Sequence, residues 1–277
     1  MKQLILLKKN STLLFIFISI LTLAQSKRIY YQVTFKLDSS IVKNDIVVLE
    51  INNESNLFLS NDYIITDSLN SLTNYSKTEF AYPKFNRIIK YYKTTPSYDY
   101  INNLSSDYYI YKKEVNLKWN LTDEKKKIGA FNVQKATTEY GGRHWIAWFS
   151  QDIPYPYGPY IFNGLPGLIL EIYDDNENYK FSFFKNKNFE KNFDLNRLDA
   201  LFGNQKINIK NSDDWKKIQM DYYNNPLKEY KSGDAYMTKE NGEEYTANDY
   251  KNLENSIKNQ IKKYNNPIEL NEKIDYK

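Results

Sequence analysis

Residues 143–171 constrain the fold of this chain more than any other stretch. They read RHWIAWFSQDIPYPYGPYIFNGLPGLILE and hold four of the eight prolines and three of the nine glycines. Because proline fixes φ and lacks an N–H donor, the part that follows Ser150 cannot lie inside a sheet. It also carries too many aromatic side chains to stay in solvent. We therefore expect residues 150–167 to form an ordered loop that folds back over one end of a sheet as a lid.

The residues on either side of this loop have the pattern of paired strands. Gly141 and Gly142 separate two β-like runs, 131–140 and 143–150, and a Gly-Gly pair suits the positive φ angles of a tight hairpin. In the second run both alternating sets are largely apolar, which predicts a central strand covered on both faces. A second hairpin is expected from 168–173 and 179–185. The residues expected to shape the whole segment are Gly141, Gly142, Gly158, Pro159, Gly164, Pro166 and Gly167.

The run GLPGLI at 164–169 resembles the signature of the GLPGLI family, secreted envelope proteins of Bacteroidota-type bacteria. The resemblance extends to the QKATT run at 134–138, to DIP at 152–154 and to NPIEL at 266–270. It implies an exported protein whose activity is not established. The family often carries a cysteine just before the QKATT run. This chain has Val133 there, so a thiol role at that position is absent.

The first 24 residues have the composition of a secretory signal peptide. Lys2, Lys8 and Lys9 precede an apolar run, and Ala24 ends it before a plausible cleavage point. Cleavage at 1–24 would leave one domain over 25–277, exported to the periplasm or cell envelope and not transmembrane. Removing three lysines and no acids lowers the formal charge from +4 to +1, which argues against a nucleic-acid partner. Without cysteine, the chain has neither disulfides nor a lipid-anchor site.

The remaining chain predicts an α+β fold that is mainly β. Strand patterns cover 29–37, 45–51, 57–60, 87–93, 108–119 and 207–210, whereas 62–72 fits either a helix or irregular structure. The charged run 123–127 is interpreted as a solvated turn. Helical spacing begins at Trp215, and Thr246 with Asp249 forms a capping-box pattern before a second helix that ends at 264. We expect a curved antiparallel, half-barrel-like sheet over 28–210 with C-terminal amphipathic helices, 212–265, packed on it.

Ordinary metal and nucleophile chemistry has little support in the sequence. His144 is the only histidine and cysteine is absent, so we expect no metal, no cofactor and no catalytic residue. The polar run around Asp174 is interpreted as a hairpin turn. Arg143 lies in an apolar hairpin and needs a partner, because a buried unpaired charge is costly. Asp152 or Glu171 would supply an internal one, which we favour over a ligand carboxylate or phosphate.

Three functional hypotheses follow. The first is a non-enzymatic envelope protein that binds a lipid, another apolar ligand, a peptide or a partner protein through the loop 150–167. The second is an accessory interaction module of an outer-membrane transport or secretion complex. The third is a hydrolase that uses Asp152 and Glu171. The candidate ligand- or partner-binding residues are Arg143, Trp148, Asp152, Tyr160, Phe162, Leu165 and Glu171.

Overall fold

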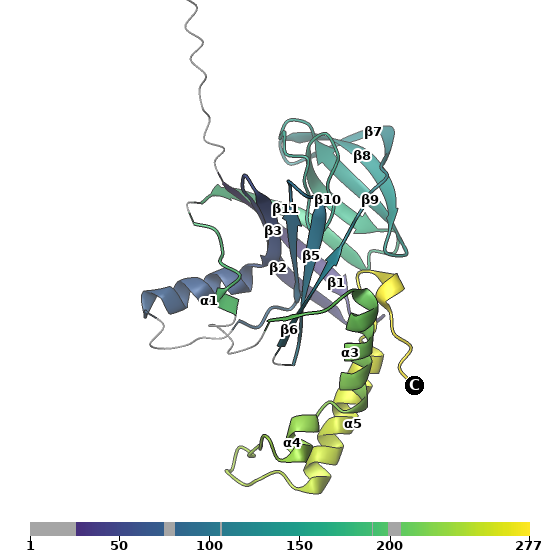
Figure 1. Ribbon diagram of the computed structural model, residues 1–277. Coiled ribbons are helices and arrows are strands. Elements are labelled where there is room, and N and C mark those ends of the chain that lie inside the picture. Colours follow the sequence, from purple (N-terminus) through teal and green to yellow (C-terminus); the bar gives the residue numbers. More distant parts are fainter. Residues whose placement is uncertain (1–25, 75–80, 106, 190, 199–205) are drawn as a thin grey trace, which may run out of the picture.

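The computed structural model describes residues 26–74, 81–105, 107–189, 191–198 and 206–277 (Figure 1). The expected signal peptide, 1–24, lies outside these ranges. No helix within them is both long enough and apolar enough to span a membrane.

One large sheet contains all the strands that are described. In chain order they are β1 (Lys27–Lys36), β2 (Val42–Ile51), β3 (Ser55–Ser60), β4 (Arg87–Tyr92), β5 (Ser97–Leu104), β6 (Asp107–Lys113), β7 (Asn120–Ile128), β8 (Phe131–Tyr140), β9 (Arg143–Ser150), β10 (Leu168–Asp174), β11 (Tyr179–Asn188) and β12 (Lys206–Asn208). The helices are α1 (Asn61–Leu72), α3 (Ser212–Asn224), α4 (Lys228–Ser232) and α5 (Ala247–Lys263), and a 3-10 turn, η1, covers Leu270–Glu272.

Two meanders joined side by side make up the sheet. Its strand order is β12-β6-β5-β4-β3-β2-β1-β11-β10-β9-β8-β7. The strands from β1 to β6 form one wing and those from β7 to β11 the other, and the wings meet where β1 pairs with β11. Neighbouring strands are antiparallel except for β12, which runs parallel to β6, so the sheet is mixed.

The connection between the two wings requires the sheet to curve. Ten intervals separate β6 from β7 in the strand order, and a flat sheet would place them about 48 Å apart at about 4.8 Å per interval. The link 114–119 has six residues, and its seven steps reach at most about 25 Å. The edges of the two wings must therefore approach each other, which gives the open half-barrel expected from the sequence.

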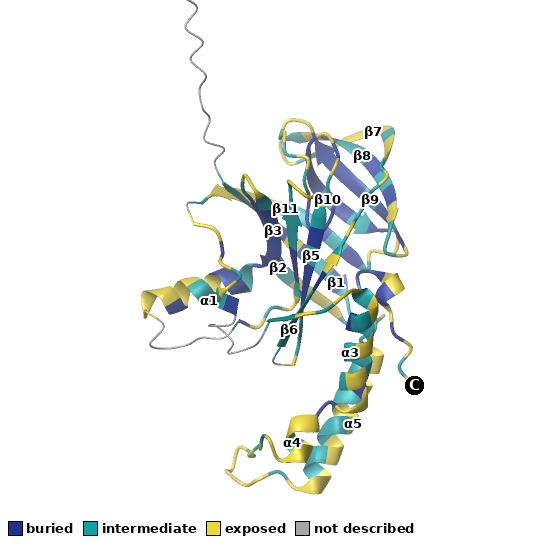
Figure 2. Ribbon diagram, in the orientation of Figure 1, coloured by how far each residue is buried: buried dark blue, intermediate teal, exposed yellow. Residues whose placement is uncertain are grey.

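Both faces of this curved sheet are covered over part of their area. The inner face carries the larger core, which includes Trp145, Phe149, Phe162, Leu168 and Phe181. A second core lies on the other face of the first wing, beneath α1 and the segment around Phe193. Figure 2 shows buried residues along the strands and mostly exposed residues along α5. The loop 150–167 belongs to the inner core.

The C-terminal helices meet the sheet at one end only. Trp215, in the first turns of α3, is buried with its ring 5.6 Å from that of Tyr109 on β6. From there α3 and α5 run together away from the sheet (Figure 1). Thr246 and Asp249 form the predicted capping box at the start of α5. The expected fold class, mainly β with an unclosed curved sheet and C-terminal helices, is confirmed.

The predicted bounds of individual strands, helices and turns agree with the structure to different degrees. The hairpin of 131–140 and 143–150 is confirmed with the same bounds, and the ambiguous run 62–72 is the helix α1, capped by Ser60. The solvated turn expected at 123–127 is wrong, because these residues lie in β7. Its lysine-rich exposed pattern is that of an edge strand, which charge protects from pairing with other chains. The strand expected over 108–119 ends at Lys113, where the chain leaves for the opposite edge.

Candidate functional site

The loop 150–167 has a buried inner part and an exposed outer edge. Tyr160, Phe162 and Leu165 are buried, and the ring of Phe162 lies 4.6 Å from that of Trp145. Where Tyr160 and Phe162 face β3, β4 and β5, the space that remains is about 10 Å³, at the lower limit for one water molecule. The mouth expected between loop and sheet is therefore filled by protein side chains. The outer edge, 151–157, lies at the surface, with Pro154 and Pro156 exposed.

Hydrogen bonds within the loop hold its backbone in place. The N–H of Gly164 donates to the carbonyl of Pro156 at 2.9 Å, and that of Leu168 donates to the carbonyl of Ile153 at 3.0 Å. The indole of Trp119 donates to the carbonyl of Asn163 at 2.7 Å. Proline lacks the N–H that a sheet ladder needs, so these bonds order the loop without sheet pairing.

Arg143 holds the C-terminal segment against the hairpin that starts the site. Its Nη1 lies 2.9 Å from a carboxylate oxygen of Asp174. Its Nε donates to the carbonyl of Ile268 at 2.9 Å, and Nη2 donates to the Asn266 side chain and the Pro267 carbonyl, both at 2.7 Å. The guanidinium is thus paired internally, as expected for a buried charge. Its partner is Asp174, and not Asp152 or Glu171 as expected from the sequence.

The two carboxylates named from the sequence lie elsewhere. Side chains alternate along β9, so Arg143 shares the inner face with Trp145, whereas Glu171 pairs opposite Trp148 on the other face. There Glu171 sits between Lys126 at 2.8 Å and Lys180 at 3.3 Å. Partial burial acts to raise the pKa of Glu171, but these two lysines hold it below its usual value.

Trp148 and Asp152 differ in their surroundings. Trp148 is buried, and the ammonium of Lys126 lies 4.2 Å from its ring. Asp152 is exposed and lies beyond Ser150, where the β9–β10 ladder ends opposite Leu168. The paired carboxylates that the hydrolase hypothesis requires are therefore not assembled from Asp152 and Glu171.

A buried carboxylate that the sequence analysis did not single out fixes the inner loop. Glu269 is fully buried and accepts a hydrogen bond of 2.5 Å from the hydroxyl of Tyr160. It also forms an ion pair with Lys113 at the end of β6. Burial raises the pKa of Tyr160 well above its usual value, and nearby Glu269 adds to this, so the phenol stays protonated and donates. A Cβ on Gly141 would come within 2.9 Å of Glu269, which ties the Gly-Gly turn to this contact.

Glu272, one turn later, extends the same buried network. Its carboxylate accepts a 2.9 Å hydrogen bond from Tyr111 and pairs with Arg87 at 3.1 Å. Burial acts to raise the pKa of Glu272, but the charges of Arg87 and Lys113 hold it below its usual value. Both glutamates are enclosed and partnered. In this structure they anchor the C-terminal segment to the sheet.

Tyr160 itself adopts a backbone conformation that needs this support. Its φ is +59°, in the left-handed region that bulky side chains rarely adopt. Such a residue costs about 1–3 kcal/mol and persists only where the surroundings enforce it. Here the rings of Phe58 and Tyr100, 6.1 and 6.2 Å away, and the bond to Glu269 enforce it.

Comparisons with known proteins match this region. A family model described as "Protein of unknown function (Porph_ging)" matches residues 141–171, which span β9, the loop and the first half of β10. No curated protein sequence matches the chain.

Among solved structures, two of PNGF-II are similar to this chain. The first, in space group P21, aligns at 16% identity with a TM-score of 0.48, over 68% of this chain and 32% of that one. The second, in space group C2, aligns at 17% identity with a TM-score of 0.47, over 68% and 31%. The chain thus spans about a third of the length of these proteins.

The arrangement provides a fixed surface, held by ion pairs to the buried carboxylates of Asp174, Glu269 and Glu272. Within the described ranges no group of three or more histidine, aspartate or glutamate side chains is placed to hold a metal ion. His144 contacts Glu139 at 2.5 Å near the surface. The sequence signal that could have revealed Glu269 and Glu272 is their position in and just after the NPIEL run. The partners of these two glutamates lie on β4, on β6 and in the loop, more than a hundred residues away, and are not visible in that run.

Proposed function

We propose that this chain is an exported, GLPGLI-type envelope protein that binds a partner protein through the outer edge of its proline-rich loop. Export rests on the signal-peptide pattern of 1–24. The observation that carries the binding proposal is the division of the loop. Its inner part is packed and bonded to Glu269, while Pro154, Tyr155 and Pro156 reach the surface.

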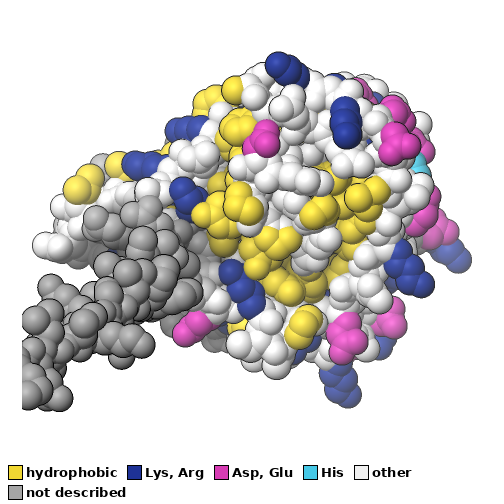
Figure 3. All heavy atoms as spheres, turned by 90° about the horizontal axis from the view of Figure 1, so that it is seen from above, with side chains coloured by type: hydrophobic (Ala, Val, Ile, Leu, Met, Phe, Trp, Pro, Cys, Tyr) yellow, Lys and Arg dark blue, Asp and Glu magenta, His cyan; other side chains and the backbone are white. Residues whose placement is uncertain are grey.

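A rigid, partly apolar edge has the properties of a binding surface. Partners lose less entropy when they bind a surface that is already ordered, and tyrosine supplies large contact area with few rotatable bonds. Figure 3 shows hydrophobic side chains gathered near the centre of one face of the molecule, with charged side chains around them. An apolar patch with a polar surround is typical of protein–protein contact sites.

The filled interior favours a protein partner over a lipid carried beneath the loop. A bound acyl chain needs a cavity of several hundred Å³, whereas the space under the loop is about 10 Å³. The proposed partner is therefore another envelope protein, with an outer-membrane transport or secretion complex as the class to test first.

Site-specific crosslinking in the native envelope tests this proposal. A photo-crosslinking amino acid in place of Tyr155 should give one adduct of defined mass, whose protein component mass spectrometry identifies. The matched control is the same amino acid in place of Tyr236, which is 82% exposed and far along the chain in the α4–α5 connection. Tyr155→Ala should then lower co-purification of the identified partner at least about tenfold, as expected for an aromatic anchor. Equal adducts from both positions, or none from position 155, would refute it.

A further inference from the structure

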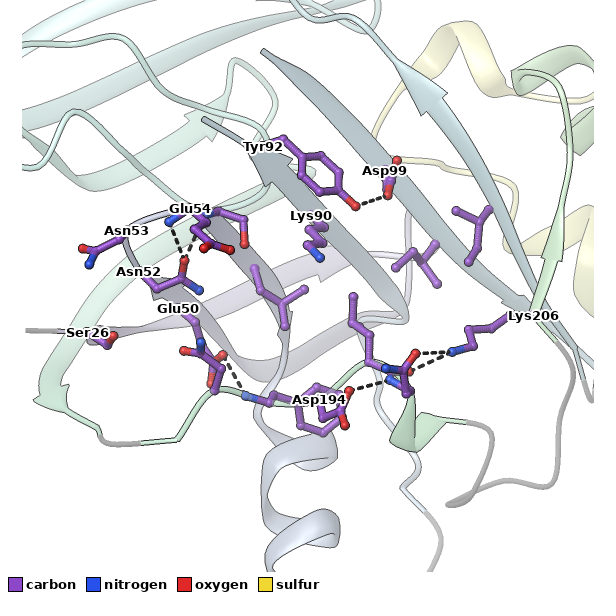
Figure 4. Close-up of a pocket in the computed structure, with 18 residues that line it drawn as sticks. Ser26, Glu50, Asn52, Asn53, Glu54, Lys90, Tyr92, Asp99, Asp194 and Lys206 are labelled. Atoms are coloured by element: carbon purple, nitrogen blue, oxygen red, sulfur yellow. Dashed lines mark hydrogen bonds between the residues drawn. The ribbon is translucent and has the colours of Figure 1, made fainter. Parts of the chain in front are cut away.

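A second candidate site lies on the face of the first wing that the loop does not cover. It is an open pocket of about 650 Å³, a size typical of small-ligand sites. The turn between β2 and β3, strands β3 to β6 and the segment 192–196 surround it, and Leu57, Ile101 and Phe193 provide its apolar lining. Figure 4 shows Lys90, Tyr92 and Asp99 on one wall of this pocket and Asn52, Asn53 and Glu54 on another.

Strand register explains which charges in the pocket already have partners. Glu50 lies opposite Leu57 on the neighbouring strand. Leu57 in turn lies opposite Lys90, and Lys90 lies opposite Asp99, so these four side chains share one face of the sheet. The carboxylate of Glu50 is bound to Arg28 at 2.6 Å. That of Asp99 is bound to Lys112 and to the hydroxyl of Tyr92, both at 2.7 Å.

Lys90 and Glu54 face the pocket without a side-chain partner of this kind among the described residues. The ammonium of Lys90 is half-buried and lies 4.8 Å from the ring of Tyr92, but it forms no ion pair with any described residue. The carboxylate of Glu54, exposed at the β2–β3 turn, likewise has no side-chain partner within the described ranges. Asp194 also lines the pocket, but its carboxylate accepts a 2.9 Å hydrogen bond from the backbone N–H of Asn196. Lys90 and Glu54 are therefore the cation and the anion of this pocket that have no hydrogen-bonded partner among the described residues.

The spacing of these groups indicates the size of the ligand. Ser55 lies opposite Tyr92 and Leu57 opposite Lys90, so the backbone of Glu54, which precedes Ser55, is displaced from that of Lys90 by about 10 Å along the strand direction. An extended tripeptide spans about the same distance. Two exposed amides also line the wall: the side chains of Asn53 and Asn192 match the donor and acceptor of a peptide bond.

We propose that this pocket binds a short peptide with free termini, its carboxylate at Lys90 and its ammonium at Glu54. The apolar lining formed by Leu57, Ile101 and Phe193 takes an aliphatic side chain of the ligand. This site is separate from the outer edge of the loop, so its occupancy does not depend on the partner proposed above.

Calorimetric titration of the full chain with the tripeptide Ala-Leu-Ala tests the proposal. We expect a Kd below about 1 mM, and at least about tenfold weaker binding when either the peptide's amino group is acetylated or its carboxylate is amidated. The proposed site would be refuted if no heat of binding were measured at 10 mM peptide, about ten times that Kd limit. Equal affinity for the capped peptides would overturn the assignment of the two charges.

Two variants assign each end of the ligand. Lys90→Met should weaken binding about tenfold and remove the discrimination against the amidated peptide, while Glu54→Gln should do the same for the acetylated peptide. The control is Lys185→Met, because Lys185 lies at the same 4.8 Å from the ring of Tyr30 and does not line the pocket. Circular dichroism checks the fold of each variant. Loss of affinity in the control, or unchanged affinity in Lys90→Met, would contradict the proposal.

Discussion

Replacing Arg143 with leucine should lower the free energy of unfolding by about 3–5 kcal/mol, the usual cost of breaking a buried ion pair from one side. The substitution leaves the carboxylate of Asp174 buried with only neutral partners, Asn178 at 2.9 Å and the Tyr179 N–H at 2.7 Å. It also strips donors from the carbonyls of Pro267 and Ile268. Urea unfolding followed by tryptophan fluorescence measures the loss, because Trp145 is fully buried two residues away.

The control for this variant is an ion pair at the surface. Lys217 is 75% exposed and lies 3.1 Å from Asp214 in the first turns of α3. Lys217→Met should change the free energy of unfolding by less than about 1 kcal/mol. If Arg143→Leu were no more destabilising than this control, Arg143 would not hold the C-terminal segment, and the account of a fixed loop would fail with it.

Gly167→Ala should also be strongly destabilising, because the atoms next to Gly167 belong to the backbone and cannot move aside. A Cβ at this position would lie 2.1 Å from the carbonyl oxygen of Ser150 and 3.0 Å from the Cα of Gln151. Both are backbone atoms at the end of β9, so relief requires the strand or the GLPG turn to move. We expect a loss of more than about 3 kcal/mol, beyond the usual range for overpacking, and poor yields of folded protein.

A second glycine separates this steric effect from backbone strain. Gly129 has a φ of +58° but nothing within 4 Å of an added Cβ. Gly129→Ala should therefore cost only the left-handed conformational penalty, about 1–2 kcal/mol. Thermal unfolding of both variants compares them directly. Equal midpoint temperatures of unfolding for the two variants would show that Gly167 and Ser150 are farther apart than they are in the structure.

The parts of the fold that the sequence predicted are those set by local pattern. The Gly-Gly turn and the alternation on either side fixed β8 and β9 to the residue, and the Thr246 capping box located the start of α5. Proline content correctly excluded 151–167 from the sheet. In each case a few adjacent residues carry the physical cause, so no knowledge of the rest of the chain is needed.

Long-range contacts account for what sequence patterns missed. β7 has the charged run 123–127 at its centre and becomes a strand because β8 pairs with it. β5 follows Pro96 in a stretch for which no strand was predicted from the sequence. The partner of Arg143 depends on which face of β10 each carboxylate occupies, and a register shift between Ile169 and Glu171 decides this. Glu269 reaches Tyr160 across 109 residues of sequence. Such pairings follow from the curved sheet as a whole.

Hydrogen exchange of the native protein tests the central claim, that the loop is a closed and fixed part of the core. The N–H groups of Gly164, Leu168 and Ile169 all donate within the loop or to its ends. They should exchange only through global unfolding, with the same opening free energy as the amides of β9. The result that would contradict this account is exchange of these three amides at opening free energies near zero while β9 stays protected. That result would mean the loop opens on its own, and that its inner residues, Tyr160, Phe162 and Leu165, are available to a ligand.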